Sequence, residues 1–126
     1  MKWKIYKENS EDLGFAISCF FNRAITSDEF KRWLDIVLMD TPTEELPNYF
    51  FDLVDGDVFD ISKNMGYVPH DNLSRYEEYA VEGIAYIRKI RSLTDMSVKE
   101  ETALKSLQNN PQILERFKKF FPFVEI

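Results

Sequence analysis

The chain has 126 residues and a formal net charge of −6, from 16 basic and 22 acidic side chains. Hydrophobic residues make up 44% and aromatic residues 15%, which excludes a disordered chain and is enough for the core of one ordinary domain. A single cysteine excludes an internal disulfide. With no long apolar run and no signal-like N-terminus, we expect a cytoplasmic protein that is not in a membrane.

The first part of the chain is predicted to form an arm and two amphipathic helices. Residues 2–7 alternate charged and apolar side chains, which allows a short strand or an extended arm. Apolar residues at helical spacing then predict a helix over about 10–22. Thr26 and Glu29 have the spacing of a capping box and predict a second helix, with Trp33 on its buried face. Its wet face is expected to carry Asp28, Lys31, Arg32 and Asp35.

Shorter segments follow, separated by prolines and glycines. A short helical turn is predicted at 41–44, with Pro42 in its first turn, and another helix from Pro47 to about Gly56. Residues 55–72 contain several Gly, Pro, Asp and Asn residues and are predicted to be irregular.

The last part of the chain is predicted to be helical again. The longest helix is expected over about 72–92. Ser97 and Glu100 have the spacing of a second capping box, and Asn110 with Pro111 starts a final helix. The chain is therefore predicted to be all-α, a single compact domain of five or six helices over residues 1–126.

The side chains that most often carry chemistry are sparse. Cys19 lies in an apolar run and is expected to pack as a small hydrophobic residue, and His70 lies in the irregular segment without histidine or cysteine neighbours. There is no glycine-rich phosphate loop, nucleophile elbow or paired-histidine zinc motif. We therefore predict no enzyme activity, no catalytic residue, no cofactor and no metal. One alternative stays open, since four carboxylates within 52–60 can hold a cation, although not in the order of an EF-hand.

Nucleic acid and membranes are not expected partners. Basic residues occur only in small groups, such as 88–89 and 118–119, and the nearby aromatic residues have the spacing of a helix core. Core packing also explains the amphipathic helices, so a membrane surface is not needed to account for them.

The negative charge is concentrated in residues 28–60. This stretch has ten acidic and two basic residues, a net charge of −8, whereas the segments before and after it are close to neutral. One interpretation is a solvated face that keeps the protein soluble. The other is a surface for a basic partner, because clustered like charges repel one another and otherwise disfavour folding.

Four segments resemble the immunity proteins of bacterial contact-dependent growth inhibition and related polymorphic-toxin systems. They are Phe21-Asn-Arg-Ala-Ile-Thr-Ser-Asp-Glu-Phe-Lys-Arg-Trp33, Leu46-Pro-Asn-Tyr-Phe-Phe-Asp-Leu53, Gly66-Tyr-Val-Pro69 and Gly83-Ile-Ala-Tyr-Ile-Arg88. The resemblance implies a cytoplasmic inhibitor without enzyme activity that binds one cognate toxin domain, often a basic nuclease. It transfers no catalytic residue to this chain.

The favoured hypothesis is therefore an immunity protein that meets its toxin through an acidic and aromatic surface, with Tyr49, Phe50 or Phe59 as packed anchors. The alternative is an α-helical adaptor or regulatory subunit for another protein partner, and a small hydrolase comes third. A gene directly upstream for a large secreted protein with a variable toxic C-terminus would favour immunity. The residues predicted to bind the partner are Glu44, Glu45, Tyr49, Asp52, Asp55, Asp57, Phe59 and Asp60.

Overall fold

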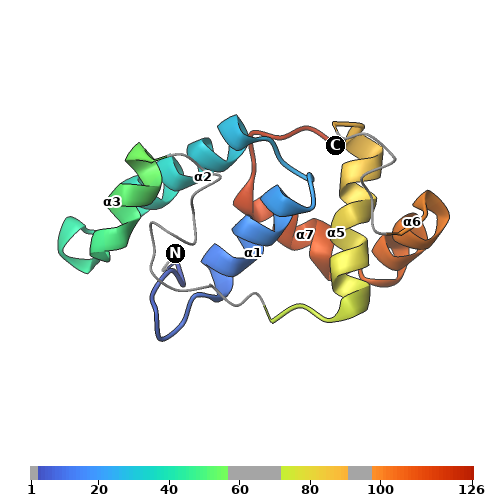
Figure 1. Ribbon diagram of the computed structural model, residues 1–126, viewed down its shortest axis with the longest axis horizontal. Coiled ribbons are helices and arrows are strands. Elements are labelled where there is room, and N and C mark those ends of the chain that lie inside the picture. Colours follow the sequence, from blue (N-terminus) through green and yellow to red (C-terminus); the bar gives the residue numbers. More distant parts are fainter. Residues whose placement is uncertain (1–2, 57–71, 91–97) are drawn as a thin grey trace. The chain divides into compact units, whose positions relative to one another are not determined.

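The computed structural model describes residues 3–56, 72–90 and 98–126, which form six α-helices and one short 3-10 helix (Figure 1). The all-α class and the number of helices are confirmed for these residues. Most of the segment predicted to be irregular, 55–72, lies outside them. The elements are α1 (Glu11–Phe21), α2 (Ser27–Asp40), the 3-10 helix η1 (Thr43–Glu45), α3 (Asn48–Asp55), α5 (Arg75–Arg88), α6 (Glu100–Asn109) and α7 (Pro111–Phe120).

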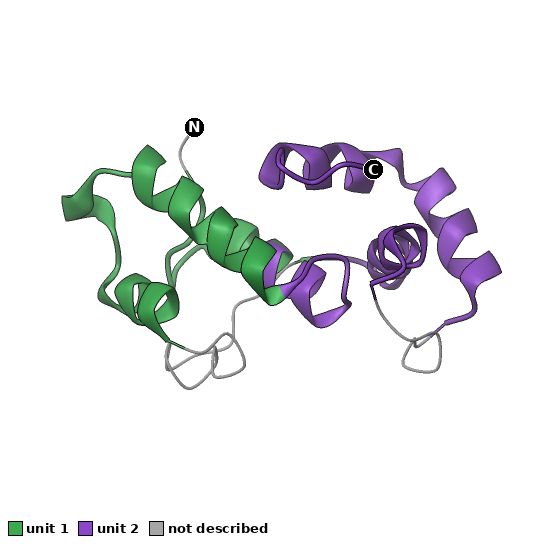
Figure 2. Ribbon diagram, turned by 90° about the horizontal axis from the view of Figure 1, so that it is seen from above, with its two compact units in different colours: residues 1–15, 27–72 green, residues 16–26, 73–126 purple. Residues whose placement is uncertain are grey.

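The chain folds into two compact units, each discontinuous in sequence (Figure 2). Unit 1 comprises residues 1–15 and 27–72, and unit 2 comprises residues 16–26 and 73–126. The boundary between them falls within α1. The prediction that residues 1–126 are one domain stays a prediction.

The core of unit 1 is built around Trp33 of α2, which is fully buried as predicted. The ring of Trp3 meets it edge-on, with centroids 5.5 Å apart, and the ring of Phe30 lies 6.0 Å away. Trp3 was not predicted to be part of the core. Its indole N–H donates to the carboxylate of Asp40 over 3.2 Å, which attaches the N-terminal arm to the end of α2. The other buried apolar residues of this unit are Ile5, Leu13, Phe15, Leu34, Val37, Phe50 and Leu53.

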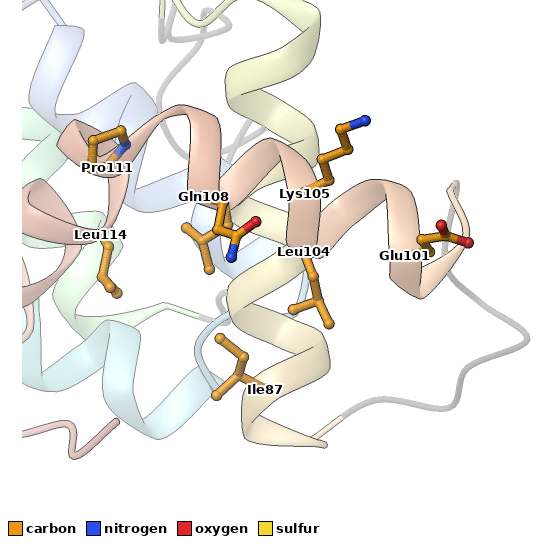
Figure 3. A pocket seen from close by; sticks show the side chains of 8 residues that line it. Ile87, Glu101, Leu104, Lys105, Gln108, Pro111 and Leu114 are labelled. Atoms are coloured by element: carbon orange, nitrogen blue, oxygen red, sulfur yellow. The ribbon is translucent and has the colours of Figure 1, made fainter.

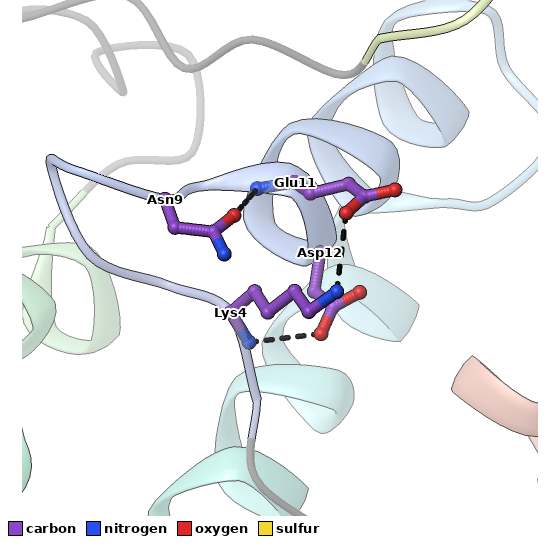
Figure 4. Close-up of polar contacts among 4 residues, drawn as sticks. All are labelled: Lys4, Asn9, Glu11 and Asp12. Atoms are coloured by element: carbon purple, nitrogen blue, oxygen red, sulfur yellow. Dashed lines mark hydrogen bonds and ion pairs between the residues drawn. The ribbon is translucent and has the colours of Figure 1, made fainter.

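The N-terminal arm also completes the first turn of α1 (Figure 4). The backbone N–H of Lys4 donates to the carboxylate of Asp12 over 2.8 Å, and the Lys4 carbonyl accepts from the N–H groups of Asp12 and Leu13. The Lys4 ammonium pairs with Glu11 at 3.3 Å. The arm thus supplies partners for N–H groups that have none within a helix. It is an extended arm with one turn at 6–9, closed by an isolated β-bridge.

Helix α1 ends in a Schellman motif, within unit 2. The N–H of Ala24 donates to the carbonyl of Cys19 over 2.8 Å, and the N–H of Arg23 donates to that of Phe20 over 3.1 Å. Arg23 adopts the left-handed conformation, with φ of 64°, that glycine usually occupies there. The Arg88 guanidinium donates to the Ala24 carbonyl over 2.8 Å and holds the turn against α5.

Helix α5 begins with a capping box that we did not predict. The Ser74 hydroxyl accepts from the N–H of Glu77 over 3.2 Å, and the N–H of Ser74 donates to the Glu77 carboxylate over 3.0 Å. This second bond is the largest reason why the pKa of Glu77 lies below its ordinary value of 4.5. The helix is shorter than the predicted 72–92, because Lys89 leaves the helical conformation with φ of 55°.

The capping box predicted for α6 at Ser97 and Glu100 is wrong. Glu100 is the first residue of α6 rather than its third, and Lys99 occupies the N-cap position without a side-chain hydrogen bond to the helix. Ser97 itself lies outside the described residues. Helix α7 begins at Pro111 as predicted.

Helix α6 packs closely on α5 at Gly83. A Cβ atom at this position would lie 2.7 Å from the carbonyl oxygen of Ala103, so no larger residue fits without moving the backbone of α6. Cys19 is fully buried, as expected for a residue that packs. The buried apolar residues of unit 2 also include Phe20, Ile25, Ala80, Val81, Ile84, Leu107, Ile113, Phe117, Phe120 and Phe121.

Candidate partner-binding surface

The described acidic residues of the 28–60 stretch all belong to unit 1. They lie on α2, on η1 and on α3, and every one except Glu29 is exposed. The predicted site residues Asp57, Phe59 and Asp60 lie outside the described residues, as does His70. Of the predicted site, the structure therefore describes Glu44, Glu45, Tyr49, Asp52 and Asp55.

Helix α3 has one buried and one exposed face. Pro47 precedes it in an extended conformation, with φ of −68° and ψ of 149°, so the helix starts at Asn48. Phe50 and Leu53 point into the core. The exposed residues repeat at spacings of three and four and therefore share the opposite face of the helix. They are Asn48, Phe51, Asp52 and Asp55.

Phe50 was proposed as an anchor for the partner, and the structure contradicts this. It is completely buried in unit 1 and contributes to the core. Its neighbour Phe51 is 42% exposed instead, and it sits one residue from Asp52 and one helical turn from Asp55. A helix turns by about 100° per residue, so consecutive phenylalanines point in different directions, and of the two on α3 only Phe50 is directed at the core. Leu53 is apolar and lies three residues after Phe50, and this helical spacing indicates that Phe50 is buried and Phe51 is not.

Tyr49 has a structural role within unit 1. Its hydroxyl donates a hydrogen bond to the backbone carbonyl of Ile5 in the N-terminal arm. The side chain is half-buried. The polar end of Tyr49 is thus used to hold the arm, and only part of its ring faces solvent.

Lys31 was predicted on the wet face of α2, and this is a second correction. Its ammonium donates to the carbonyls of Leu53, Val54 and Gly56 over 2.8, 2.7 and 2.5 Å. These are carbonyls at the C-terminus of α3, where the helix dipole favours a cation. One of the two bases in the acidic stretch is therefore turned toward α3 and forms hydrogen bonds within unit 1.

Elsewhere on unit 1, α2 presents a second exposed row. Asp28, Arg32, Asp35 and Met39 are exposed and follow one another at spacings of three and four. Met39 is 88% exposed. Exposed apolar side chains thus lie beside carboxylates on both α2 and α3, an arrangement that suits contact with a protein.

The described residues 3–56, 72–90 and 98–126 contain no group of three or more His, Cys, Asp or Glu side chains that could hold a metal ion. Only half of the Asp52–Asp60 carboxylates lie within these ranges. In the same ranges, no helix has the length and apolar character to cross a membrane. No protein family, curated protein or solved structure matches the chain.

Proposed function

We propose that this chain is an immunity protein of a contact-dependent growth inhibition or related polymorphic-toxin system. It would bind a cognate toxin domain, a basic nuclease, and neutralise it without any enzyme activity of its own. The proposal rests on the unequal distribution of charge between the two units. Unit 1 contains fourteen acidic and six basic residues, a net charge of −8, whereas unit 2 contains eight acidic and ten basic residues, a net charge of +2.

Such a division is useful when the partner is basic. A nuclease gathers lysines and arginines to bind nucleic-acid phosphates. Carboxylates on unit 1 can meet those same side chains, attract the toxin over a distance and exclude its substrate. Phe51 would enter an apolar pocket of the toxin while Asp52 and Asp55 contact basic groups at its rim. The inhibitor needs only this complementarity, and no reacting group.

An adaptor or regulatory subunit for a different protein is the alternative. It would use the same exposed aromatic and acidic side chains, but its partner would not be toxic. The two functions differ in genetic context and in outcome, because only an immunity protein rescues cells from the product of the adjoining gene.

The direct test is co-expression with the toxin domain encoded upstream. We expect cells that make the toxin alone to stop growing, cells that also make this chain to grow, and the purified proteins to form a complex. A toxin domain from an unrelated system is the control and should be neither bound nor neutralised. Toxicity that persists in the presence of this chain, at equal expression, would contradict the proposed function.

A further inference from the structure

The Lys31 ammonium occupies the C-terminus of α3 in unit 1. It donates to the carbonyls of Leu53, Val54 and Gly56 over 2.8, 2.7 and 2.5 Å. An ammonium has three N–H donors, so these bonds use all of them. Lys31 comes from α2 and follows Phe30, which is fully buried. The bonds thus attach the end of α3 to a helix that the core of unit 1 holds in place.

Helix α3 benefits from such bonds because it is short. It has eight residues, and Pro47 at its N-cap makes no side-chain hydrogen bond to it. Isolated helices shorter than about 12 residues are marginal in water, and their last four carbonyls have no partner within the helix. At the start of α3, the Tyr49 hydroxyl donates to the Ile5 carbonyl. Polar contacts therefore hold α3 at both ends, and the buried Phe50 and Leu53 hold it between them.

The side chains proposed to meet the toxin belong to the helix that Lys31 holds. Phe51, Asp52 and Asp55 are exposed on α3, and the carbonyls bonded by Lys31 belong to their neighbours 53, 54 and 56. In the described part of the chain, Lys31 forms no ion pair with Asp52 or Asp55. Its ammonium bonds to the backbone instead, so both carboxylates stay available to a basic partner.

We infer that Lys31 is a positioning residue for the α3 face formed by Phe51, Asp52 and Asp55. The inference rests on the proposed function, because this face is the one that would meet the toxin. A face that is ordered in the free protein loses little conformational entropy on binding. If the ordered state is only partly populated, the apparent affinity falls by that fraction. Lys31 therefore acts on affinity through α3 and needs no contact with the toxin.

Charge and position predict opposite effects for the loss of Lys31. Its removal makes unit 1 more acidic by one charge, which strengthens the attraction of a basic toxin. Loss of its bonds to α3 weakens binding instead. Lys7→Met is the matched control, because Lys7 is exposed in the N-terminal arm of unit 1 and carries the same charge.

The first measurement is amide hydrogen exchange on the free chain. Lys31→Met should accelerate exchange at 53–56 about tenfold or more, the factor expected for lost hydrogen bonds to a charged group. The reference is α5 and α6 of unit 2, the helices around the groove of about 740 Å³ in Figure 3. Their amides should remain slower, which would show that α3 opens while these helices stay folded. Unchanged exchange at 53–56, or equal exchange in all helices, would overturn the inference.

The second measurement is the affinity for the toxin domain, by titration calorimetry. Lys31→Met should weaken binding about threefold or more, as expected if α3 is formed in about a third of the molecules or fewer. A purely structural residue would change stability, but the folded molecules would bind with unchanged affinity. Lys7→Met should bind as tightly as the wild type or more tightly. Lys31→Gln keeps an N–H donor and should lie between the wild type and Lys31→Met; it replaces Lys31→Met if circular dichroism shows that variant to be unfolded.

The two measurements separate this inference from the proposed function. Faster exchange in α3 with unchanged affinity for Lys31→Met would refute the positioning role, and the proposed function would stand. An equal loss of affinity in Lys7→Met would also refute it, because charge alone would then explain the effect. A wild-type chain that does not bind the toxin domain would contradict the proposed function and this role together, whereas exchange would still show whether Lys31 holds α3.

Discussion

Phe51 is an exposed aromatic side chain that lies beside carboxylates in the described part of unit 1. It belongs to the short helix α3 and faces away from the core that Phe50 enters. An exposed phenylalanine contributes little to stability but can contribute much to binding if a partner buries it. Its role can therefore be separated from folding.

We predict that Phe51→Ala weakens binding to the toxin domain about thirtyfold or more, as truncation of a buried interface anchor does. Phe21→Ala is the matched control, because Phe21 is 54% exposed but belongs to unit 2. Titration calorimetry on both variants gives the comparison. Equal affinities for Phe51→Ala and the wild type would remove Phe51 from the interface.

Lys31 connects two helices of unit 1, α2 and α3, through three hydrogen bonds to the C-terminal carbonyls of α3. We predict that Lys31→Met lowers the free energy of unfolding by about 1.5–3 kcal/mol, the range for hydrogen bonds to charged groups. Urea denaturation would measure this loss. The control is Lys119→Met at an exposed position, which should change the free energy of unfolding by less than about 0.5 kcal/mol. An equally small change for Lys31→Met would show that its hydrogen bonds do not stabilise the fold.

The start of α5 shows how a helix terminus makes stability depend on pH. The Glu77 carboxylate accepts from the N–H of Ser74 and is stabilised in its charged form, so its pKa is lowered in the folded state. A carboxylate whose pKa is lowered by folding stabilises the folded state when the pH lies above its ordinary pKa of 4.5. This stabilisation is lost as the pH falls through the lower pKa that Glu77 has in the folded state.

We therefore predict that Glu77→Gln, which keeps an acceptor oxygen but cannot titrate, loses less stability than the wild type between about pH 5 and about pH 3. Glu125→Gln, near the C-terminus and outside any described helix, should follow the wild type. Thermal unfolding over this pH range is the measurement. Parallel pH curves for Glu77→Gln and the wild type would contradict the assignment.

The elements were largely predictable because apolar spacing and turn residues act locally. The bounds of α1 follow from its apolar spacing, those of α2 from the pattern around Trp33, and those of α3 from Pro47 and Gly56. Capping was less predictable. Ser74 and Glu77 form a capping box, whereas α6 begins at Glu100 with Lys99 at its N-cap, although Ser97 and Glu100 have the same spacing in the sequence.

The candidate surface was only partly predictable for a related reason. Exposure of Glu44, Glu45, Asp52 and Asp55 follows from their charge. The inward turn of Lys31 does not, because it depends on where the C-terminus of α3 lies relative to α2, and no local pattern encodes that. The same holds for Tyr49 and Trp3, whose partners Ile5 and Asp40 are distant in sequence.

At the scale of the whole molecule, unit 1 has a net charge of −8 and unit 2 is slightly basic, at +2. If this division serves to attract a basic partner, local charge on unit 1 should govern the rate of association. The net charge of the whole chain should not by itself determine this rate. The two can be separated, because both units have exposed acidic residues that can be reversed in pairs.

The most direct test is the association rate with the toxin domain, measured by stopped flow at several salt concentrations. We predict that the wild-type rate falls as salt shortens the Debye length from about 30 Å at 0.01 M to about 10 Å at 0.1 M. Asp52→Lys with Asp55→Lys should slow association about tenfold or more at low salt. Glu100→Lys with Glu115→Lys changes the net charge equally, but on unit 2, and should have a much smaller effect. Equal rates for the two double variants, or a wild-type rate independent of salt, would contradict a role of unit 1 in attracting its partner.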